Sequence, residues 1–148
     1  MNSNSPVTQR HVILHNDVSQ ISVLTDFVTD IARERNLDSS LSHSLVLAME
    51  EAVVNVLMYA YPEKEQGLVD VEATLYRDAI EFTVTDSGKP FDPTAVPQTD
   101  ISLGLEERQV GGLGILLVRT IMDKVCYRRE NGKNILKLTK NIYQWKSR

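Results

Sequence analysis

Two polar side chains lie one helical turn apart in an otherwise apolar segment, "EEAVVNVLMYAYPE", at residues 50–63. The segment predicts a helix, and at about 100° per residue Glu51 and Asn55 share one of its faces. A carboxylate there could act as a general base, and an amide oxygen is a ligand that Mg²⁺ accepts. The spacing therefore indicates a polar site on a helix, although a surface Glu and Asn one turn apart would give the same pattern.

A second candidate site lies in "VTDSGKPFDP", residues 84–93, where Asp86 follows a predicted strand and the chain must turn. A carboxylate at a strand end accepts hydrogen bonds, and Gly88 lets a ligand approach the backbone. This combination suits a flat group that carries a donor, such as the amine of adenine. An ordinary turn is the alternative, because D-x-G alone does not specify a ligand.

The third candidate site is a glycine cluster, Gly111, Gly112 and Gly114, in "QVGGLGILLV". A glycine inside a helix costs up to about 1 kcal/mol relative to alanine, so three at a helix start need a reason. Free backbone amides at a helix N-terminus, with no Cβ in the way, can bind a phosphate. The spacing matches neither a Rossmann fingerprint nor a P-loop. A glycine cluster with only a structural role is the alternative.

The elements that position these residues follow from hydrophobic periodicity and turn residues. The order β-α-α-β-β-α-β-β predicts an α+β fold, a two-layer α/β sandwich whose mostly antiparallel sheet is covered on one face by three helices. In chain order we expect a strand at 11–16, a helix at 17–36, a helix from Asp38 or Ser39 to Tyr61, a hairpin at 68–86, a loop at 87–110, a helix at 111–123 and a hairpin at 124–142.

One domain accounts for this pattern. We expect it to span residues 10–143, with a flexible tail at 1–9 and a second tail at 144–148. Asp17 is the expected cap of the first helix. Cys126, on a strand of the last hairpin, is expected to be a small core residue.

Composition narrows the function classes. The 148 residues carry a formal net charge of −4, which argues against direct nucleic-acid binding because such proteins normally display a basic face. No apolar run approaches the ~20 residues that cross a bilayer, and the first residues do not resemble a secretory signal. The single cysteine cannot form an internal disulfide. We therefore expect a cytoplasmic protein with no membrane contact.

Taken together, the three motifs resemble the GHKL ATP-binding superfamily, which includes DNA gyrase, histidine kinases and mismatch-repair MutL. "EEAVVNVLMYAYPE" resembles its N box, "DSGKPFDP" its first glycine box and "GGLGILLVRTIMDKVCYRRENGKNILKLTK" its second box with the closing hairpin. The short chain, "PFDP" and "GGLGILLVR" look most like the anti-sigma-factor serine/threonine kinases. The resemblance covers roughly residues 40 to 140.

The resemblance implies a role for each candidate residue. Asn55 would coordinate Mg²⁺, and Glu51 would act as general base toward the attacking hydroxyl. Asp86 would accept a hydrogen bond from the adenine amine of ATP, with Gly88 shaping that end of the pocket. The remaining implied positions are Gly111, Gly112 and Gly114 at the phosphates, a lid at 94–110, possible phosphate contacts from Lys89 and Arg108, and Tyr59 in place of a frequent histidine.

The resemblance also implies partners. Members of this branch bind a sigma factor and phosphorylate a STAS-domain antagonist, and they often form homodimers. We therefore expect an anti-sigma factor with ATP-dependent serine/threonine kinase activity. The alternative is an ATP-binding regulatory module with little or no phosphoryl transfer.

Overall fold

The computed structural model describes residues 6–61, 66–95 and 112–142. Their elements follow the predicted order, with two short 3-10 helices added. The elements are β1 Pro6–His15, η1 Val18–Gln20, α1 Ile21–Glu34, α2 Ser39–Tyr59, β2 Leu68–Tyr76, β3 Ala79–Asp86, η2 Pro93–Ala95, α3 Gly112–Ile121, β4 Lys124–Glu130 and β5 Lys133–Asn141.

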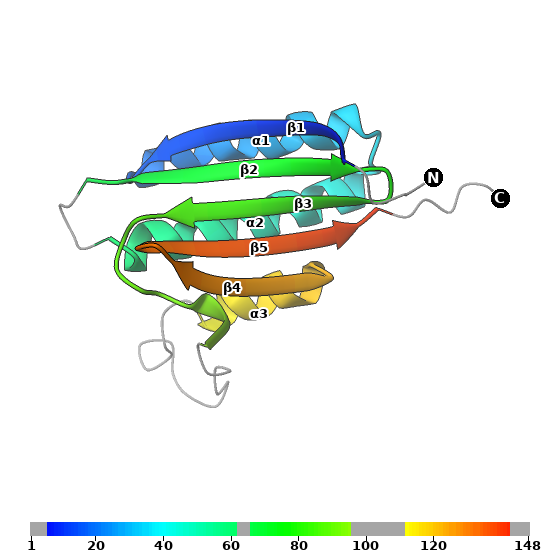
Figure 1. Cartoon of the computed structure of the whole chain (residues 1–148). Coiled ribbons are helices and arrows are strands. Elements are labelled where there is room, and N and C mark those ends of the chain that lie inside the picture. Colours follow the sequence, from blue (N-terminus) through cyan, green and yellow to red (C-terminus); the bar gives the residue numbers. More distant parts are fainter. Residues whose placement is uncertain (1–5, 62–65, 96–111, 143–148) are drawn as a thin grey trace.

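The five strands form one sheet in the order β1-β2-β3-β5-β4, and every neighbouring pair is antiparallel (Figure 1). The two hairpins β2–β3 and β4–β5 are therefore neighbours through β3 and β5. In the second hairpin, Asn131 and Gly132 both have positive φ, 52° and 76°, as the tight turn of a two-residue hairpin requires. The Asn-Gly pair in "ENGK" is typical of such a turn.

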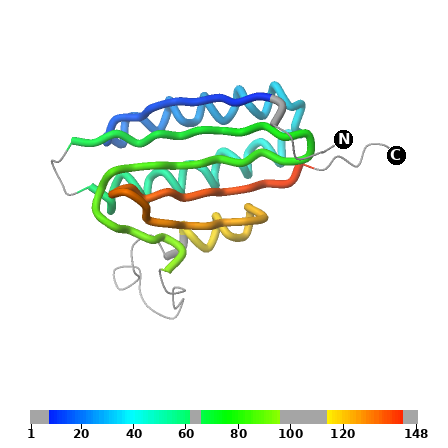
Figure 2. The backbone as a smooth tube through the Cα atoms, viewed as in Figure 1, coloured from blue at the N-terminus to red at the C-terminus, as the bar shows by residue number. Residues whose placement is uncertain are grey.

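All three α-helices of the described chain lie behind the sheet in the view of Figure 1, and the opposite face has no helix over it. The path of the chain in Figure 2 shows that β1 begins and β5 ends at the same end of the sheet. This arrangement confirms the predicted α+β sandwich. Alternate residues along the predicted hairpin at 68–86 form one buried face: Val69, Val71, Ala73, Leu75, Ile80, Phe82 and Val84.

Helix α2 lies between α1 and α3 and forms the centre of the helical layer. Asp38 caps it, since its carboxylate accepts a hydrogen bond from the amide of Leu41 at 2.8 Å. The helix is long and apolar enough to cross a membrane by composition, but seven of its apolar residues are buried in the core of this fold. Apolar residues at helical spacing on one side of α2 are all buried: Leu45, Met49, Ala52, Val53 and Val56.

Three local expectations are wrong. Strand β1 begins at Pro6, so residues 6–9, expected in the flexible tail, pair with β2 along the sheet edge. Asp17 caps η1 rather than α1, since its carboxylate accepts from Ser19 at 3.0 Å. Cys126 is exposed, because β4 alternates and its neighbours Val125 and Tyr127 take the inward positions.

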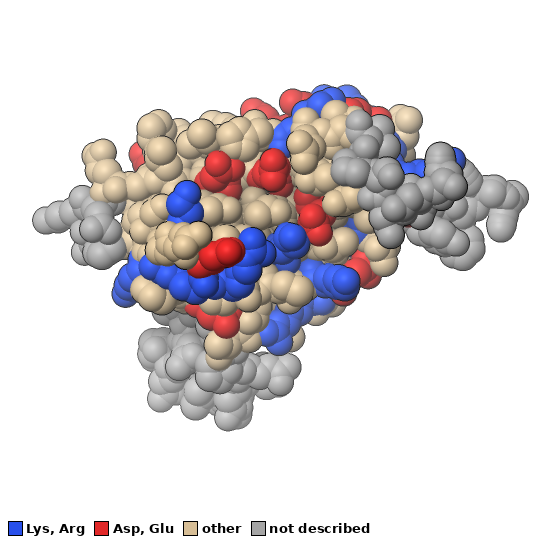
Figure 3. All heavy atoms as spheres, in the orientation of Figure 1, with Lys and Arg blue, Asp and Glu red and all other residues tan. Residues whose placement is uncertain are grey.

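The open face of the sheet is polar and divided by charge. In Figure 3 a band of lysine and arginine side chains crosses the lower part of this face, and acidic side chains lie above it. The acidic residues on β2 and β3 include Asp70, Glu72 and Glu81. Six of the 16 basic residues of the chain belong to the β4–β5 hairpin: Lys124, Arg128, Arg129, Lys133, Lys137 and Lys140.

Candidate functional site

One end of the candidate site forms where α3 packs against α2. A Cβ on Gly114 would lie 2.7 Å from Glu51 Oε1 and 3.6 Å from Asn55 Nδ2. A glycine at this position therefore lets the backbone of α3 come close to both polar side chains of α2. The Glu51 carboxylate makes no hydrogen bond or ion pair with any described residue.

Two buried polar atoms on α2 lack partners. Asn55 is 5% exposed, and neither its Nδ2 nor the hydroxyl of Tyr59 has a hydrogen-bond partner among the described residues. An unpaired buried polar group costs about 1–3 kcal/mol, which a bound ligand could offset. The two side chains are four residues apart on α2, as is Glu51 from Asn55. The ring of Tyr59 packs against Phe91, with ring centroids 5.5 Å apart.

Asp86 forms the other end of the candidate site, at the last residue of β3. Its side chain is buried, and Oδ1 accepts hydrogen bonds from the Gly88 amide and from Asn134 Nδ2, both at 2.8 Å. Oδ2 has no hydrogen-bond partner among the described residues. Burial raises the pKa of the Asp86 carboxyl, while the two hydrogen bonds and the charge of Arg129 oppose the shift. The carboxylate thus has one oxygen held and one available to a donor.

Gly88 joins this end of the site to α2. A Cβ on Gly88 would lie 2.2 Å from the carbonyl oxygen of Ala60, a backbone atom that cannot move aside easily. The Lys89 amide donates to the same carbonyl at 2.7 Å, while the Lys89 side chain is exposed. The predicted role of Gly88 in shaping this end of a nucleotide pocket stays a prediction. A phosphate contact from Lys89 stays a prediction.

Asn134 was missed by sequence reasoning, yet it forms hydrogen bonds with Asp86, Lys89 and Phe91. It is 3% exposed on β5, donates to Asp86, and accepts at Oδ1 from the Tyr127 hydroxyl at 2.5 Å and from Arg129 at 3.1 Å. A signal was present in the sequence. Asn134 occupies an inward position of the alternation that continues with buried Leu136 and Leu138, and a polar residue in such a position needs partners.

Part of the predicted site lies outside the described residues. Gly111, Arg108 and most of the expected lid at 94–110 belong to that part. Gly112 is the first residue of α3, where the prediction placed free amides. At the edge of the described chain, Arg119 of α3 donates to the carbonyl of Thr94 in η2, which ties the end of the glycine-box loop to the helix.

The two ends of the site are connected by α2. Glu51 and Asn55 lie close to Gly114. Ala60, nine residues after Glu51, contacts Gly88 beside Asp86. At 1.5 Å per residue, this separates the two ends by about 13 Å. This layout matches one elongated ligand that carries a ring with a hydrogen-bond donor at one end and an anionic group at the other.

Comparison with known proteins agrees with the motifs. The family described as the histidine kinase-like ATPase domain matches residues 14–140. The serine-protein kinase RsbW of Listeria monocytogenes is 30% identical over 119 residues, covering 78% of this chain and 75% of that protein. The serine/threonine-protein kinase BtrW of Bordetella bronchiseptica is 27% identical over 130 residues, covering 83% of this chain and 92% of that protein.

A solved structure shows the same fold. The crystal structure of the RsbU and RsbW domains of a Mycobacterium tuberculosis protein superposes with a TM-score of 0.65 at 17% identity, covering 92% of this chain and 33% of that one. The family match spans both ends of the candidate site, from Glu51 through Asp86 to Gly114. The chain therefore belongs to the histidine kinase-like ATPase domain family.

Proposed function

We propose that the protein is an ATP-dependent serine/threonine protein kinase that also acts as an anti-sigma factor. The observation that carries the kinase activity is the Glu51 carboxylate, which lies beside Gly114 and the buried Asn55 amide and has no ion pair among the described residues. The relatives named serine-protein kinase and serine/threonine-protein kinase support the same activity.

In this proposal Glu51 is the general base. Its carboxylate accepts the proton of a serine or threonine hydroxyl while the hydroxyl oxygen attacks the γ-phosphorus and ADP leaves. Such proton transfer is worth about 10²–10⁴-fold in rate. A domain that only binds ATP needs no carboxylate at this position, and the lack of any ion pair to Glu51 among the described residues leaves the group free to act as base.

Mg²⁺ fits the residues present. Asn55 carries a carbonyl oxygen as well as the unpaired Nδ2, and rotation of the amide can present the oxygen to a cation. In the described part of the chain, no three His, Cys, Asp or Glu side chains gather at metal-binding distances. This agrees with Mg²⁺, which often takes one or two protein ligands and completes its shell with water and phosphate oxygens. The bound ion would neutralise phosphate charge.

Asp86 selects the base in this proposal. Its available Oδ2 would accept a hydrogen bond from the amine of adenine, whereas the carbonyl of guanine at the equivalent position would be repelled. The amides at the start of α3, from Gly112 onward, would approach the phosphates. Helix α2 connects the two ends of the site, about 13 Å apart, so a single nucleotide would contact both.

The partners are also part of the proposal. The motif resemblance supports a sigma factor as the sequestered protein and a STAS-domain antagonist as the phosphorylated one. Both would be met in the cytoplasm, without direct nucleic-acid or membrane contact. A homodimer is a further expectation, which sedimentation at micromolar concentration would test; monomer alone would remove it.

The decisive experiment uses adjacent glutamates on α2. The protein is incubated with Mg²⁺, γ-labelled ATP and STAS-domain proteins from the same genome. Glu51→Gln keeps side-chain size but removes the base, so phosphotransfer should fall by about 10²–10⁴-fold while nucleotide binding persists. Glu50→Gln is the matched control, because Glu50 faces α1 and accepts from Thr25.

The outcomes separate the alternatives. Phosphotransfer at the parental rate by Glu51→Gln would contradict the role of Glu51 as base. A parent protein that binds ATP and its sigma factor but transfers no phosphate to any antagonist would favour the binding-module alternative.

A further inference from the structure

The buried polar contacts of Asn134 have no role in the function proposed above. It is the first inward-facing residue of β5 after the turn and is almost completely buried. Strand pairing places it opposite Asp86 of β3 on one side and Arg129 of β4 on the other. The residue therefore stands between the adenine end of the site and the edge strand of the sheet.

The Asn134 amide is fully used by its neighbours. Both Nδ2 hydrogens have acceptors, Asp86 Oδ1 and the Lys89 carbonyl, each at 2.8 Å. On its other side, Oδ1 accepts three hydrogen bonds, from the Phe91 amide, the Tyr127 hydroxyl and Arg129 Nη1. Rotating the amide by half a turn would set its NH₂ group against these donors. The contacts thus fix its orientation.

These contacts hold residues 86–91, the glycine-box turn. Asn134 reaches its first residue through the side chain of Asp86 and later residues through the backbone of Lys89 and Phe91. Arg129 adds a hydrogen bond to the Gly88 carbonyl at 2.8 Å. Apart from these contacts, the turn is held by the Lys89 amide on the Ala60 carbonyl, by the Ser87 amide on the Tyr61 hydroxyl at 2.9 Å, and by its own short-range hydrogen bonds.

We propose that Asn134 is a positioning residue for base recognition: it holds Asp86 Oδ1 and the 88–91 backbone so that Asp86 Oδ2 meets the adenine amine. The inference rests on the proposed function, since it assumes that Asp86 reads adenine. Asn134 does not touch the nucleotide in this proposal. It acts through Asp86, with Tyr127 and Arg129 holding the amide from the β4 side.

Selectivity between nucleotide bases distinguishes this positioning role of Asn134 from a purely structural one. ITP has the size and phosphates of ATP, but a carbonyl oxygen replaces the exocyclic amine, so it cannot donate to Asp86. Loss of Asn134 should therefore weaken ATP binding and leave ITP binding unchanged or stronger. A purely structural role would weaken both nucleotides together.

The test is calorimetric titration of the full chain with Mg·ATP and Mg·ITP. For Asn134→Ala we expect ATP affinity to fall by about tenfold or more, with the ATP-to-ITP preference falling equally. Asn141→Ala is the matched control, an exposed asparagine at the end of the same strand. It should keep the parental preference.

Tyr127→Phe is a second variant in case Asn134→Ala does not fold. It removes one hydroxyl donor to Asn134 and should lower the ATP-to-ITP preference in the same direction, by a smaller factor. A folded Asn134→Ala with the parental preference would overturn the inference. If only Tyr127→Phe folds, an unchanged preference there would do the same.

The proposed function can fail separately. A parent protein that binds no ATP would remove both the kinase proposal and this inference. A parent that binds ATP and transfers phosphate, alongside an Asn134→Ala variant with unchanged base preference, would remove the inference alone.

Discussion

Asp86 illustrates how a single carboxylate can be held for recognition at a cost to the fold. Its burial disfavours the charged form, which is why the pKa is raised despite hydrogen bonds from Asn134 and Gly88. In the charged form both oxygens are acceptors, so Oδ2 could accept from an adenine amine while Oδ1 accepts from Gly88 and Asn134. Stability and the proposed recognition of adenine would therefore make opposite demands on this residue.

Asp86→Asn should stabilise the protein at neutral pH and impair ATP binding. The asparagine oxygen can still accept from Gly88 and Asn134, and the buried charge is removed. Its NH₂ group would meet the adenine amine as a second donor, so ATP affinity should fall by about 10- to 100-fold. Thermal unfolding and calorimetry test the two effects. A variant with parental ATP affinity would contradict the assignment of Asp86.

The stability difference should depend on pH. A carboxyl whose folded pKa is raised binds its proton more tightly in the folded state, so the parent loses stability as pH rises through that pKa. The advantage of Asp86→Asn should therefore be largest at neutral pH and shrink as pH falls toward the ordinary value for Asp. Unfolding midpoints of the parent and of Asp86→Asn, measured between about pH 4 and 7, would show this change in the stability difference. An advantage that grows on acidification would contradict this explanation.

At the scale of elements, two glycines let neighbouring segments pack closely against α2. The atoms that an added Cβ would meet differ between the two positions. The atom nearest a Cβ on Gly114 is the end of the Glu51 side chain, whereas on Gly88 it is the backbone carbonyl of Ala60. The end of a side chain can move at little energetic cost, whereas backbone inside a packed layer cannot. Alanine at the two positions should thus have separable effects.

Gly114→Ala should fold and lose phosphotransfer. The added methyl group displaces the Glu51 carboxylate, while alanine is the better helix former by up to about 1 kcal/mol. We expect an unfolding midpoint near the parental value and a phosphotransfer rate lowered by at least about tenfold. An active variant with parental rate would show that Glu51 tolerates displacement and is not the base.

Gly88→Ala should destabilise the fold by about 1–3 kcal/mol, as expected for overpacking against backbone. Chemical denaturation of the apo protein would measure the change as a lower midpoint with an unchanged slope. A midpoint equal to that of the parent would mean that the glycine-box turn can move away from α2.

Periodicity predicted the elements best where one face is buried. The alternation in β2 and β3 and the helical spacing in α2 predicted the buried residues, because burial on one face imposes a period. The start of β1 was missed because "PVTQ" has no such alternation; this edge strand is held there by pairing with β2. Cys126 was misplaced because an inward and an outward position differ by one residue.

The candidate site was only partly predictable for a different reason. Asn55, Asp86 and Gly114 lie in motifs that local sequence shows. The Asn134 contacts depend on pairing between β3 and β5, which are 48 residues apart at Asp86 and Asn134. No local pattern specifies which strand lies beside β3. A single polar residue among inward apolar ones indicates a partner without naming it.

At the scale of the molecule, the proposed nucleotide would connect α2, α3 and the β3 end of the sheet. Because it binds only the folded state, Mg·ATP at 100 times its dissociation constant should add about 2.7 kcal/mol of stability. For a domain of this size that corresponds to a rise of roughly 5–10 °C in the unfolding midpoint. No rise on adding ATP with Mg²⁺ would contradict nucleotide binding.

Asn55→Ala separates the metal from the nucleotide in the same measurement. The variant should keep the midpoint shift produced by ATP with a chelator and lose the additional shift produced by Mg²⁺, because only the metal ligand is removed. Equal loss of both shifts would instead indicate that Asn55 supports the fold of the pocket.

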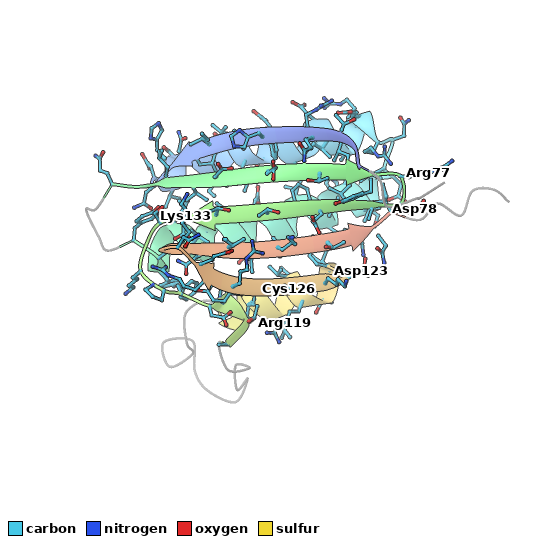
Figure 4. All side chains as sticks on the ribbon, in the orientation of Figure 1. Arg77, Asp78, Arg119, Asp123, Cys126 and Lys133 are labelled. Carbon is cyan, nitrogen blue, oxygen red and sulfur yellow. The ribbon has the colours of Figure 1, made fainter. Side chains whose placement is uncertain are left out.

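The exposed thiol of Cys126 has a practical consequence. It is the only cysteine of the chain and lies on the open face of the sheet (Figure 4), whereas Asp86 and the α2 side chains of the site lie on the helix side. A maleimide dye attached there, or a thiol-reactive sensor chip, would modify every molecule at one known position. Partner association could then be followed by fluorescence or surface plasmon resonance while the nucleotide pocket stays unlabelled.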